Sequence, residues 1–170
     1  MMLRRKRERN GGALLEAALF LPVLAMVLFG VIELSRLGWV YFTLQKGMET
    51  IGRYAATQIG ANLCDDGDPI ITEAKNLAIT GTPDASVDPV LPNLQASQIQ
   101  VRLERYNTDS ATLDECTCSS DGCDVSQGGR PPDFVVVSMP DGYSYRLAIP
   151  FISLDAFLLR PHARVPVKGI

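Results

Sequence analysis

The sequence is poor in the residues and motifs on which enzymes depend. Its 170 residues contain a single histidine, His162, which follows Pro161. The sequence contains no G-x-S-x-G, no HExxH, no phosphate-binding loop and no dinucleotide-binding glycine pattern. For this histidine a surface or structural role is the expected one. We predict that the protein is not an enzyme and uses no cofactor.

Positive charge is also scarce beyond the N-terminus. The first ten residues carry five basic side chains and one acid, Glu8, so the rest of the chain has a net charge of −7, against −3 for the whole. Nucleic-acid binding requires a basic face that displaces counterions from phosphates. We therefore exclude nucleic acid as a partner. The basic cluster has another use, because Lys and Arg beside a membrane span stay in the cytoplasm.

Charge is almost absent between Gly12 and Ile32, where Glu16 is the only ionisable side chain. Twenty helical residues reach about 30 Å, the thickness of the hydrocarbon layer of a bilayer. The pattern predicts a membrane helix with its N-terminus in the cytoplasm and residues beyond about 40 outside. A cleaved secretory signal is the alternative, but its apolar core is shorter and ends at a small-residue cleavage site.

The helical pattern continues beyond the span. Apolar residues recur at spacings of three and four, which predicts one helix from about Ala13 to about Ile59 with an amphipathic outer half. This outer half needs a partner surface, most simply the rest of the chain. Pro22 removes one backbone donor and predicts a kink. The apolar stripe consists of Leu37, Tyr41, Leu44, Met48, Ile51 and Ala55.

Two further features mark this helix. Glu33 and Arg36 are three residues apart near the outer edge of the span, and we expect them to pair with each other before they contact a partner. Glycines allow the close approach of another helix, although they are also ordinary in membrane helices. These glycines are Gly30, Gly38, Gly47 and Gly52.

Glu16 is the anomaly of the span. A carboxylate in lipid costs several kcal/mol unless it is paired, and residues 13–35 contain no Lys or Arg. Its partner must therefore lie elsewhere. The alternative is an acid that is protonated or that reaches the inner headgroups.

After Gly60 the long helical pattern gives way to short apolar segments separated by prolines and glycines, which predicts a small α+β domain. Asp68 and Pro69 start a helix, and Gly81 ends it, with an apolar face of Ile70, Ala74, Leu77 and Ala78. Strands are predicted at Ile99–Leu103 and Phe134–Met139, the latter turning at 140–142 into a strand at Tyr143–Ile149. A last strand covers Ala163–Val167, with Pro166 at a sheet edge, while Phe151–Leu159 is either a short helix or a packed loop. The fold class is α+β, a long helix packed on a small antiparallel sheet with a second short helix.

Residues 107–131 form a long polar segment that needs a covalent tie to be ordered. It contains Cys116, Cys118 and Cys123, and the fourth cysteine, Cys64, follows the long helix. Three pairings are possible. Because Cys116 and Cys118 are too close along the chain to be the expected pair, we predict that one of the three reaches Cys64. A zinc site is the alternative, with spacing that is uncommon for zinc.

Short acidic turns offer a weaker possibility of metal binding. Asp65, Asp66 and Asp68, or Asp121 and Asp124, could ligate calcium, but no EF-hand pattern is present and solvated turns are more common. We predict no metal.

The N-terminal residues resemble a known family. Gly11 followed by GALLE resembles the processing site of type IV prepilin-like proteins, a basic leader ending in glycine before an apolar helix with glutamate at its fifth position. More closely, GGALLEAALFLPVLAMVLFGVIELSRLGWVYFTLQKGMETIGRYAA is similar to the TadE-like pseudopilins of tight-adherence systems. The shared features are the G-x-x-x-x-E-x-A-L-x-x-P core, the I-E-x-x-R exit and the R-Y-A-A that follows.

This resemblance implies a domain organisation and a function. Residues 1–11 would be a leader, 12–60 the transmembrane and extended helix, and 61–170 an exported head with the cysteine-rich loop 107–131. A prepilin peptidase would cut after Gly11, or after Gly12, because glycine is unusual as the first mature residue. The freed ammonium, its own or that of a neighbouring subunit, would then pair with Glu16.

The implied protein is a minor pilin or pseudopilin in the assembly or initiation of a tight-adherence fibre. Its partners would be the bacterial inner membrane, the peptidase, other pilins, and the assembly platform and ATPase, with the head in the periplasm. The alternative is a single-pass, membrane-anchored accessory or binding protein that never enters a fibre.

Overall fold

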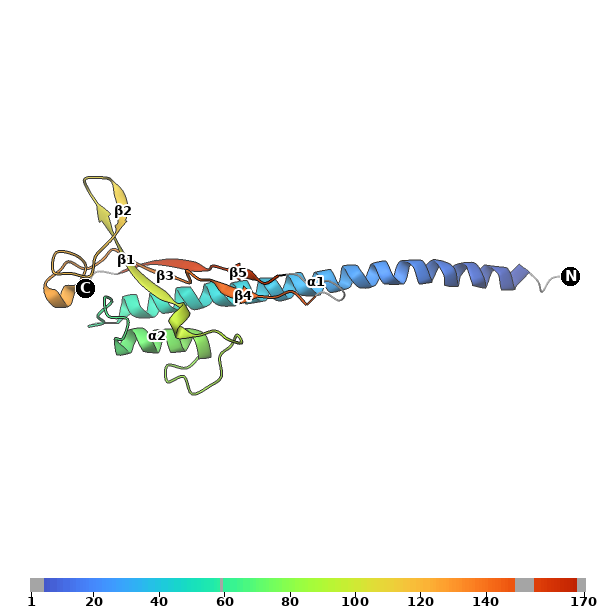
Figure 1. The fold of residues 1–170 in the computed structure, drawn as a ribbon, viewed down its shortest axis with the longest axis horizontal. Helices are drawn as coiled ribbons and strands as arrows, with labels where there is room; N and C mark the ends of the chain where they lie inside the picture. The colour runs from blue at the N-terminus through green and yellow to red at the C-terminus, as the bar shows by residue number, and fades with distance from the viewer. Residues whose placement is uncertain (1–4, 59, 149–154, 168–170) are drawn as a thin grey trace. The chain divides into compact units, whose positions relative to one another are not determined.

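The computed structural model describes residues 5–58, 60–148 and 155–167, with side chains from Gly12 onward. Its helices are α1 (Arg5–Thr57) and α2 (Pro69–Thr80), with single 3₁₀ turns η1 (Ala96–Gln98) and η2 (Val125–Gln127) (Figure 1). Its strands are β1 (Gln100–Asn107), β2 (Thr112–Glu115), β3 (Phe134–Ser138), β4 (Tyr143–Tyr145), β5 (Phe157–Leu159) and β6 (His162–Pro166). Two compact units result. One is Met1–Trp39 with Arg146–Asp155, and the other, the head, is Val40–Tyr145 with Ala156–Ile170.

The first unit is dominated by the apolar part of α1. The helix begins at Arg5, earlier than predicted, so it includes both Gly11 and Gly12. Among the described residues, α1 is the one helix whose length and apolar composition suit a membrane span, over Gly12–Thr57. The predicted end at Ile59 lies outside the described residues, and the helix ends at Thr57.

The remainder of α1 belongs to the head and buries one face there. Leu44, Met48 and Ile51 are almost fully buried, and Ala55 continues the same stripe. The stripe was predicted correctly at these positions, but Tyr41 is 42% exposed and Val40 is buried in its place. The helix therefore enters the core one residue earlier, because Val40, four residues before Leu44, lies directly in line with the buried row.

Glycines set how closely α1 packs. A Cβ built on Gly52 would lie 2.7 Å from Val165 Cγ2 and 3.6 Å from Val137 Cγ2, so the sheet touches the helix backbone here. Gly47 faces Ala78 of α2 at 3.7 Å. The prediction that glycines admit another helix is thus met at Gly47, whereas Gly52 admits the sheet. Gly30 and Gly38 have no atom within 4 Å of a built Cβ.

Helix α2 has the predicted bounds. Asp68 accepts a hydrogen bond from Ile70 N, Pro69 occupies the first turn, and Gly81 closes the helix at φ 83° with its N–H bonded to Leu77 O. The predicted apolar face was right at Ala74 and incomplete elsewhere, since Ile71, Lys75 and Ile79 are also buried, whereas Ile70, Leu77 and Ala78 are half-buried. A lysine is expected on the exposed face of a helix, so Lys75 hid the position of the buried one. Its aliphatic chain is buried, and its ammonium lies 2.6 Å from Asp66 Oδ1.

The main sheet is antiparallel, in the order β2-β1-β3-β6. Val135, Val137 and Leu103 are buried on the side of α1, whereas Arg102, Glu104 and Arg164 lie on the opposite face. Pro166 belongs to an outermost strand, as predicted. The predicted hairpin from β3 into residues 143–149 was wrong in its pairing. Strand β4 ends at Tyr145 and pairs with β5 in a separate two-stranded sheet, and Ile149 lies outside the described residues.

The segment 107–131 is more regular than the predicted loop. It contains β2, paired with β1 from Glu104↔Glu115 to Asn107↔Thr112, and the turn η2. The β1–β2 hairpin projects from the head in Figure 1. Similarly, the ambiguous segment 151–159 ends in β5, while residues 151–154 lie outside the described residues. The α+β class is confirmed, with a long apolar helix, a second short helix and antiparallel sheets.

Candidate functional site

The predicted processing segment is helical. Gly11 and Gly12 lie inside α1, and Glu16 follows on its exposed surface. Each glycine lowers helix stability by about 1 kcal/mol relative to alanine, so two in succession make this turn the easiest part of the helix to open.

Glu16 has no basic neighbour in the part of the chain whose side chains are described. The ion pairs found there all involve residues from Glu33 onward. The surrounding side chains are large and apolar, with Leu14, Leu15, Leu19 and Phe20 each about two-thirds exposed. On this surface of α1, one acid is therefore surrounded by apolar side chains, as the sequence predicted. An anionic Glu16 in lipid requires a partner from outside these residues.

Pro22 lies six residues further along α1, which continues on both sides of it. Because proline has no N–H, the carbonyl of Ala18 loses its helical hydrogen bond. The predicted kink stays a prediction.

Glu33 and Arg36 are brought together, with Arg36 Nη1 3.7 Å from Glu33 Oε1. The Glu33 side chain is only 10% exposed, whereas that of Arg36 is 59% exposed. Glu33 Oε2 also accepts the backbone N–H of Ala148 at 3.3 Å. This last contact ties a segment 115 residues away to the helix. Sequence reasoning found the ion pair but missed Ala148, because a backbone donor leaves no signal in the sequence.

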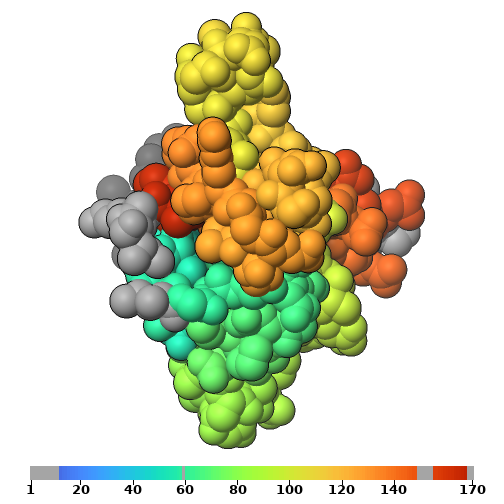
Figure 2. Space-filling model, turned by 90° about the vertical axis from the view of Figure 1, so that its left-hand side faces the viewer, coloured from blue at the N-terminus to red at the C-terminus, as the bar shows by residue number. Residues whose placement is uncertain are grey.

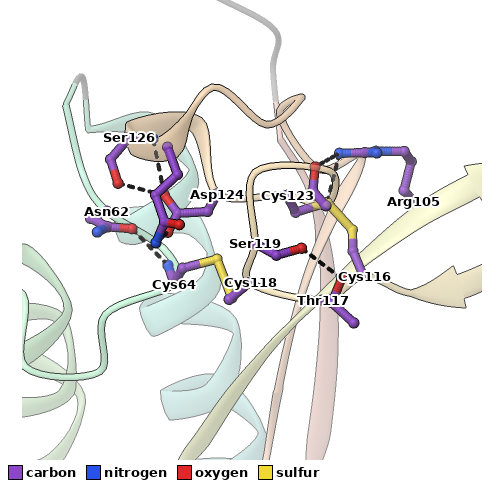
Figure 3. The surroundings of a disulfide bond; sticks show 12 residues. Asn62, Cys64, Arg105, Cys116, Thr117, Cys118, Ser119, Cys123, Asp124 and Ser126 are labelled. Carbon is purple, nitrogen blue, oxygen red and sulfur yellow. Dashed lines mark hydrogen bonds between the residues drawn. A yellow bond between two sulfur atoms is a disulfide. The ribbon is translucent and has the colours of Figure 1, made fainter.

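All four cysteines form disulfides in the head (Figure 3). Cys64 pairs with Cys118 at a Cα–Cα distance of 5.5 Å, so one of the three clustered cysteines reaches Cys64, as expected. Cys116 pairs with Cys123 at 5.7 Å and closes a small ring. Since no thiolate is left to bind zinc, the zinc alternative fails.

Arg105 organises the small ring. Its Nη2 lies 3.0 Å from Cys123 Sγ (Figure 3). The same atom donates to Gly122 O at 2.7 Å and to Arg130 O at 2.5 Å. These contacts join the middle of the cysteine-rich segment, at Gly122 and Cys123, and its end, at Arg130, to β1. Nothing in the sequence distinguished Arg105 from other strand arginines.

The carboxylates of the acidic turns accept hydrogen bonds from nearby groups of the same chain. Asp68 caps α2, and Asp65 Oδ1 accepts Gly67 N at 2.9 Å. Asp124 is buried, and hydrogen bonds from Ser126 and Gln127 hold the pKa of its carboxyl below the ordinary value despite the opposing cost of burial. Within the described residues, no three His, Cys, Asp or Glu side chains are grouped to hold a metal. His162 is exposed at the start of β6, and its carbonyl accepts Gln45 Nε2 at 2.8 Å.

Comparison with known proteins locates the similarity in the helix. Residues 11–53 match the family model described as TadE-like protein. The matched range contains Gly11, Gly12, Glu16, Pro22 and the Glu33–Arg36 pair, and it stops before the cysteines and the sheet. No curated protein and no solved structure matches the chain. The match confirms the resemblance found in the sequence, and it identifies the N-terminal segment of this chain, residues 11–53, as TadE-like.

Proposed function

We propose that the protein is a minor pilin or pseudopilin that takes part in assembling or initiating a tight-adherence fibre. The observation that carries the proposal is the TadE-like match over residues 11–53, which includes an apolar helix able to span a membrane and an acid at its start. The role is structural, in keeping with the absence of catalytic motifs from the sequence.

In this proposal the protein crosses the bacterial inner membrane once. The basic residues before Gly11 hold the N-terminus in the cytoplasm. The head then lies in the periplasm, an oxidising compartment in which two disulfides are stable. Both arguments, one from charge and one from cysteine chemistry, favour the same orientation.

Processing supplies the missing partner of Glu16. Cleavage by a prepilin peptidase between Gly11 and Gly12 would remove the basic leader and create an ammonium group about one helical turn from Glu16. An ion pair in lipid is far stronger than one in water, and an unpaired charge is correspondingly costly. The ammonium of the same chain or of a neighbouring subunit can serve, and the assembly platform and ATPase then extract the processed helix into the fibre.

The mature N-terminus tests the proposed function. We expect mass spectrometry of the protein from cells with an active prepilin peptidase to find Gly12 as the first residue, and Met1 or Met2 in cells without the enzyme. A start at Ala13 would move the cut by one residue and keep the mechanism. An unprocessed chain in competent cells would reject it and favour the tethered accessory protein.

Replacing Glu16 separates anchoring from assembly. Glu16→Gln keeps the shape of the side chain but removes the charge, so membrane insertion should be unchanged or easier, and recovery in sheared fibres should fall at least about tenfold. Asp88→Asn is the control, because Asp88 is an exposed acid of the head that lies outside α1 and outside the strands. Normal fibre recovery with Glu16→Gln would contradict the pairing.

A further inference from the structure

The main sheet of the head has an outer edge at β6. Met139 N donates to Pro161 O at 3.3 Å and Val167 N donates to Asp133 O at 2.9 Å, just beyond the two ends of the β3–β6 pairing. Antiparallel alternation then directs the backbone groups of Ala163 and Val165 toward β3 and those of His162, Arg164 and Pro166 outward. Gln45 Nε2 donates to His162 O, which agrees with a His162 carbonyl that faces away from β3. Among the described residues, no other hydrogen bond to these outward groups is present.

A groove of about 670 Å³ runs beside this edge. One wall is β6, and the other is a row of α1 side chains one turn apart, Gln45, Glu49 and Arg53. The side chains of Arg53 and Arg164 are 74% and 50% exposed. The groove thus offers both cationic side chains and unpaired backbone groups.

The opposite edge of the same sheet is β2. Cys116 N donates to Leu103 O at 2.9 Å, so the alternation directs Leu113 and Glu115 outward. This strand belongs to the hairpin that projects from the head in Figures 1 and 2. Its exposed side chains Asp114 and Glu115 are acidic. The lining of the groove carries Arg53 and Arg164 against one acid, Glu49, so its net charge is opposite to that of the β2 edge.

We propose that the β6 edge receives the β2 edge of a second copy of this chain, which extends the sheet from one head into the next. With Arg164 opposite Glu115, the two strands exchange both backbone hydrogen bonds of that pair. The next outward pair adds a third bond, from Leu113 N–H to Pro166 C=O. Pro166 has no N–H, so this pair forms one backbone bond instead of two. The interface depends on the head alone and stands whether or not the leader is cleaved.

Side chains in this register are also complementary. Arg164 and Glu115 lie directly across from each other on the face of the sheet opposite α1, as an oppositely charged cross-strand pair. Asp114 points to the other face, opposite Val165, which contacts Gly52 of α1. Its carboxylate then lies over the groove near Arg53. Hydrogen bonds from Asn107 and Thr112 orient this carboxylate and keep the pKa of Asp114 below its usual value.

Strand direction favours this arrangement. Every neighbouring pair in the sheet is antiparallel, so β2 and β6 of one head run in opposite directions. Antiparallel docking of a second β2 onto β6 therefore gives both heads the same orientation, with the Val40–Thr57 parts of both α1 helices on the same face. Both chains therefore enter their heads at Val40 on the same side. The contact is head-to-tail and leaves one free edge at each end, so it can repeat.

Little has to be broken to form the interface. Arg53 and Glu49 are 4.0 Å apart, and Arg102 and Glu115 are 3.6 Å apart, both on the surface, while Arg164 can keep its contact with Glu104 because a guanidinium has five N–H donors. Exposed pairs of this kind contribute little to stability. Three backbone bonds and two charge pairs make a weak interface in dilute solution, which becomes effective when the membrane concentrates both copies.

Charge reversal tests the proposal with the full chain in detergent. We expect sedimentation velocity over a concentration series at low salt to show self-association that weakens about tenfold in Arg164→Glu and in Glu115→Arg. An equimolar mixture of these two variants should form a dimer. The β2 edge that carries Glu115→Arg then pairs with the β6 edge that carries Arg164→Glu. Asp109→Arg, which reverses an exposed charge in the hairpin turn outside the paired strand, should behave as wild type.

Each other outcome overturns the proposal. A wild-type chain that stays monomeric at the highest concentration of the series would do so, and so would association that ignores both reversals, since another surface would then hold the copies together. If Arg164→Glu does not fold beside Glu104, its ordinary ion-pair partner at 2.8 Å, Arg164→Gln replaces it. A photo-crosslinking residue at Leu113 gives an independent readout and should link to the peptide containing Pro166. Links that go only to a different protein would reject a second copy as the occupant.

Discussion

Replacing both Cys64 and Cys118 with alanine is expected to lower the free energy of unfolding of the head by about 4 kcal/mol. The bridge joins residues 54 apart and encloses α2, β1 and β2. Without it, the unfolded chain gains the entropy of opening a long loop. Domains of this size are stable by only about 5–15 kcal/mol, so the loss leaves the head marginal. Denaturant unfolding of the full chain in detergent, followed by tyrosine fluorescence, measures the change.

The second disulfide is the matched control. Cys116 and Cys123 are only 7 residues apart, and the same entropy estimate gives about 2.5 kcal/mol for their bridge. Alanine at both positions should therefore cost less than removal of the long bridge, although Cys123 is buried and its truncation adds a small cavity term. Equal midpoints for the wild type and the Cys64 and Cys118 variant would show that the bridge does not constrain the unfolded chain.

Gly52→Ala is expected to destabilise the head by up to about 2 kcal/mol, although alanine is the better helix former. The added methyl would lie 2.7 Å from Val165 Cγ2 and 3.2 Å from Val165 Cβ, which forces α1 away from β6. Overpacking of this kind costs about 1–3 kcal/mol, and the gain in helix propensity offsets about 1 kcal/mol of it. Thermal unfolding followed by circular dichroism gives the net effect.

Gly47→Ala supplies the comparison in the same helix. Its added methyl would meet Ala78 at 3.7 Å, an ordinary contact, so only the propensity gain remains and stability should rise by up to about 1 kcal/mol. The difference between the two variants isolates the clash with β6. Val165→Ala in the Gly52→Ala background should recover part of the loss. Equal stability of the two glycine variants would mean that α1 does not rest against β6 as described.

Features that depend on neighbouring residues could be predicted from the sequence. The bounds of α2 follow from Asp68, Pro69 and Gly81, because each acts on backbone groups within the same turn. The apolar span and its single acid are likewise properties of consecutive residues. The Glu33–Arg36 contact belongs to the same class, since i,i+3 residues on a helix are always close.

Features that depend on distant residues escaped prediction. The turn at 140–142 suggested a hairpin, but β3 lies between β1 and β6, and β4 pairs with β5 instead. A turn motif specifies where the chain reverses, and it does not specify which strand is the partner. The predicted face of α2 was incomplete for a similar reason, because burial of Lys75 depends on Asp66 nine residues away.

The sequence by itself determined the apolar helix that could span a membrane, its acid at Glu16, the limits of the short helix and the α+β class, because each follows from spacing along one chain segment. Only the tertiary structure decided that Cys118 reaches Cys64, that Gly52 lies against Val165, and that acidic β2 and basic β6 form opposite edges of one sheet. These three depend on contacts between residues 50 or more positions apart or on strand order. A pattern of neighbouring residues specifies neither the distant contacts nor the strand order. The entropy cost of closing such long loops is overcome only when the whole core forms.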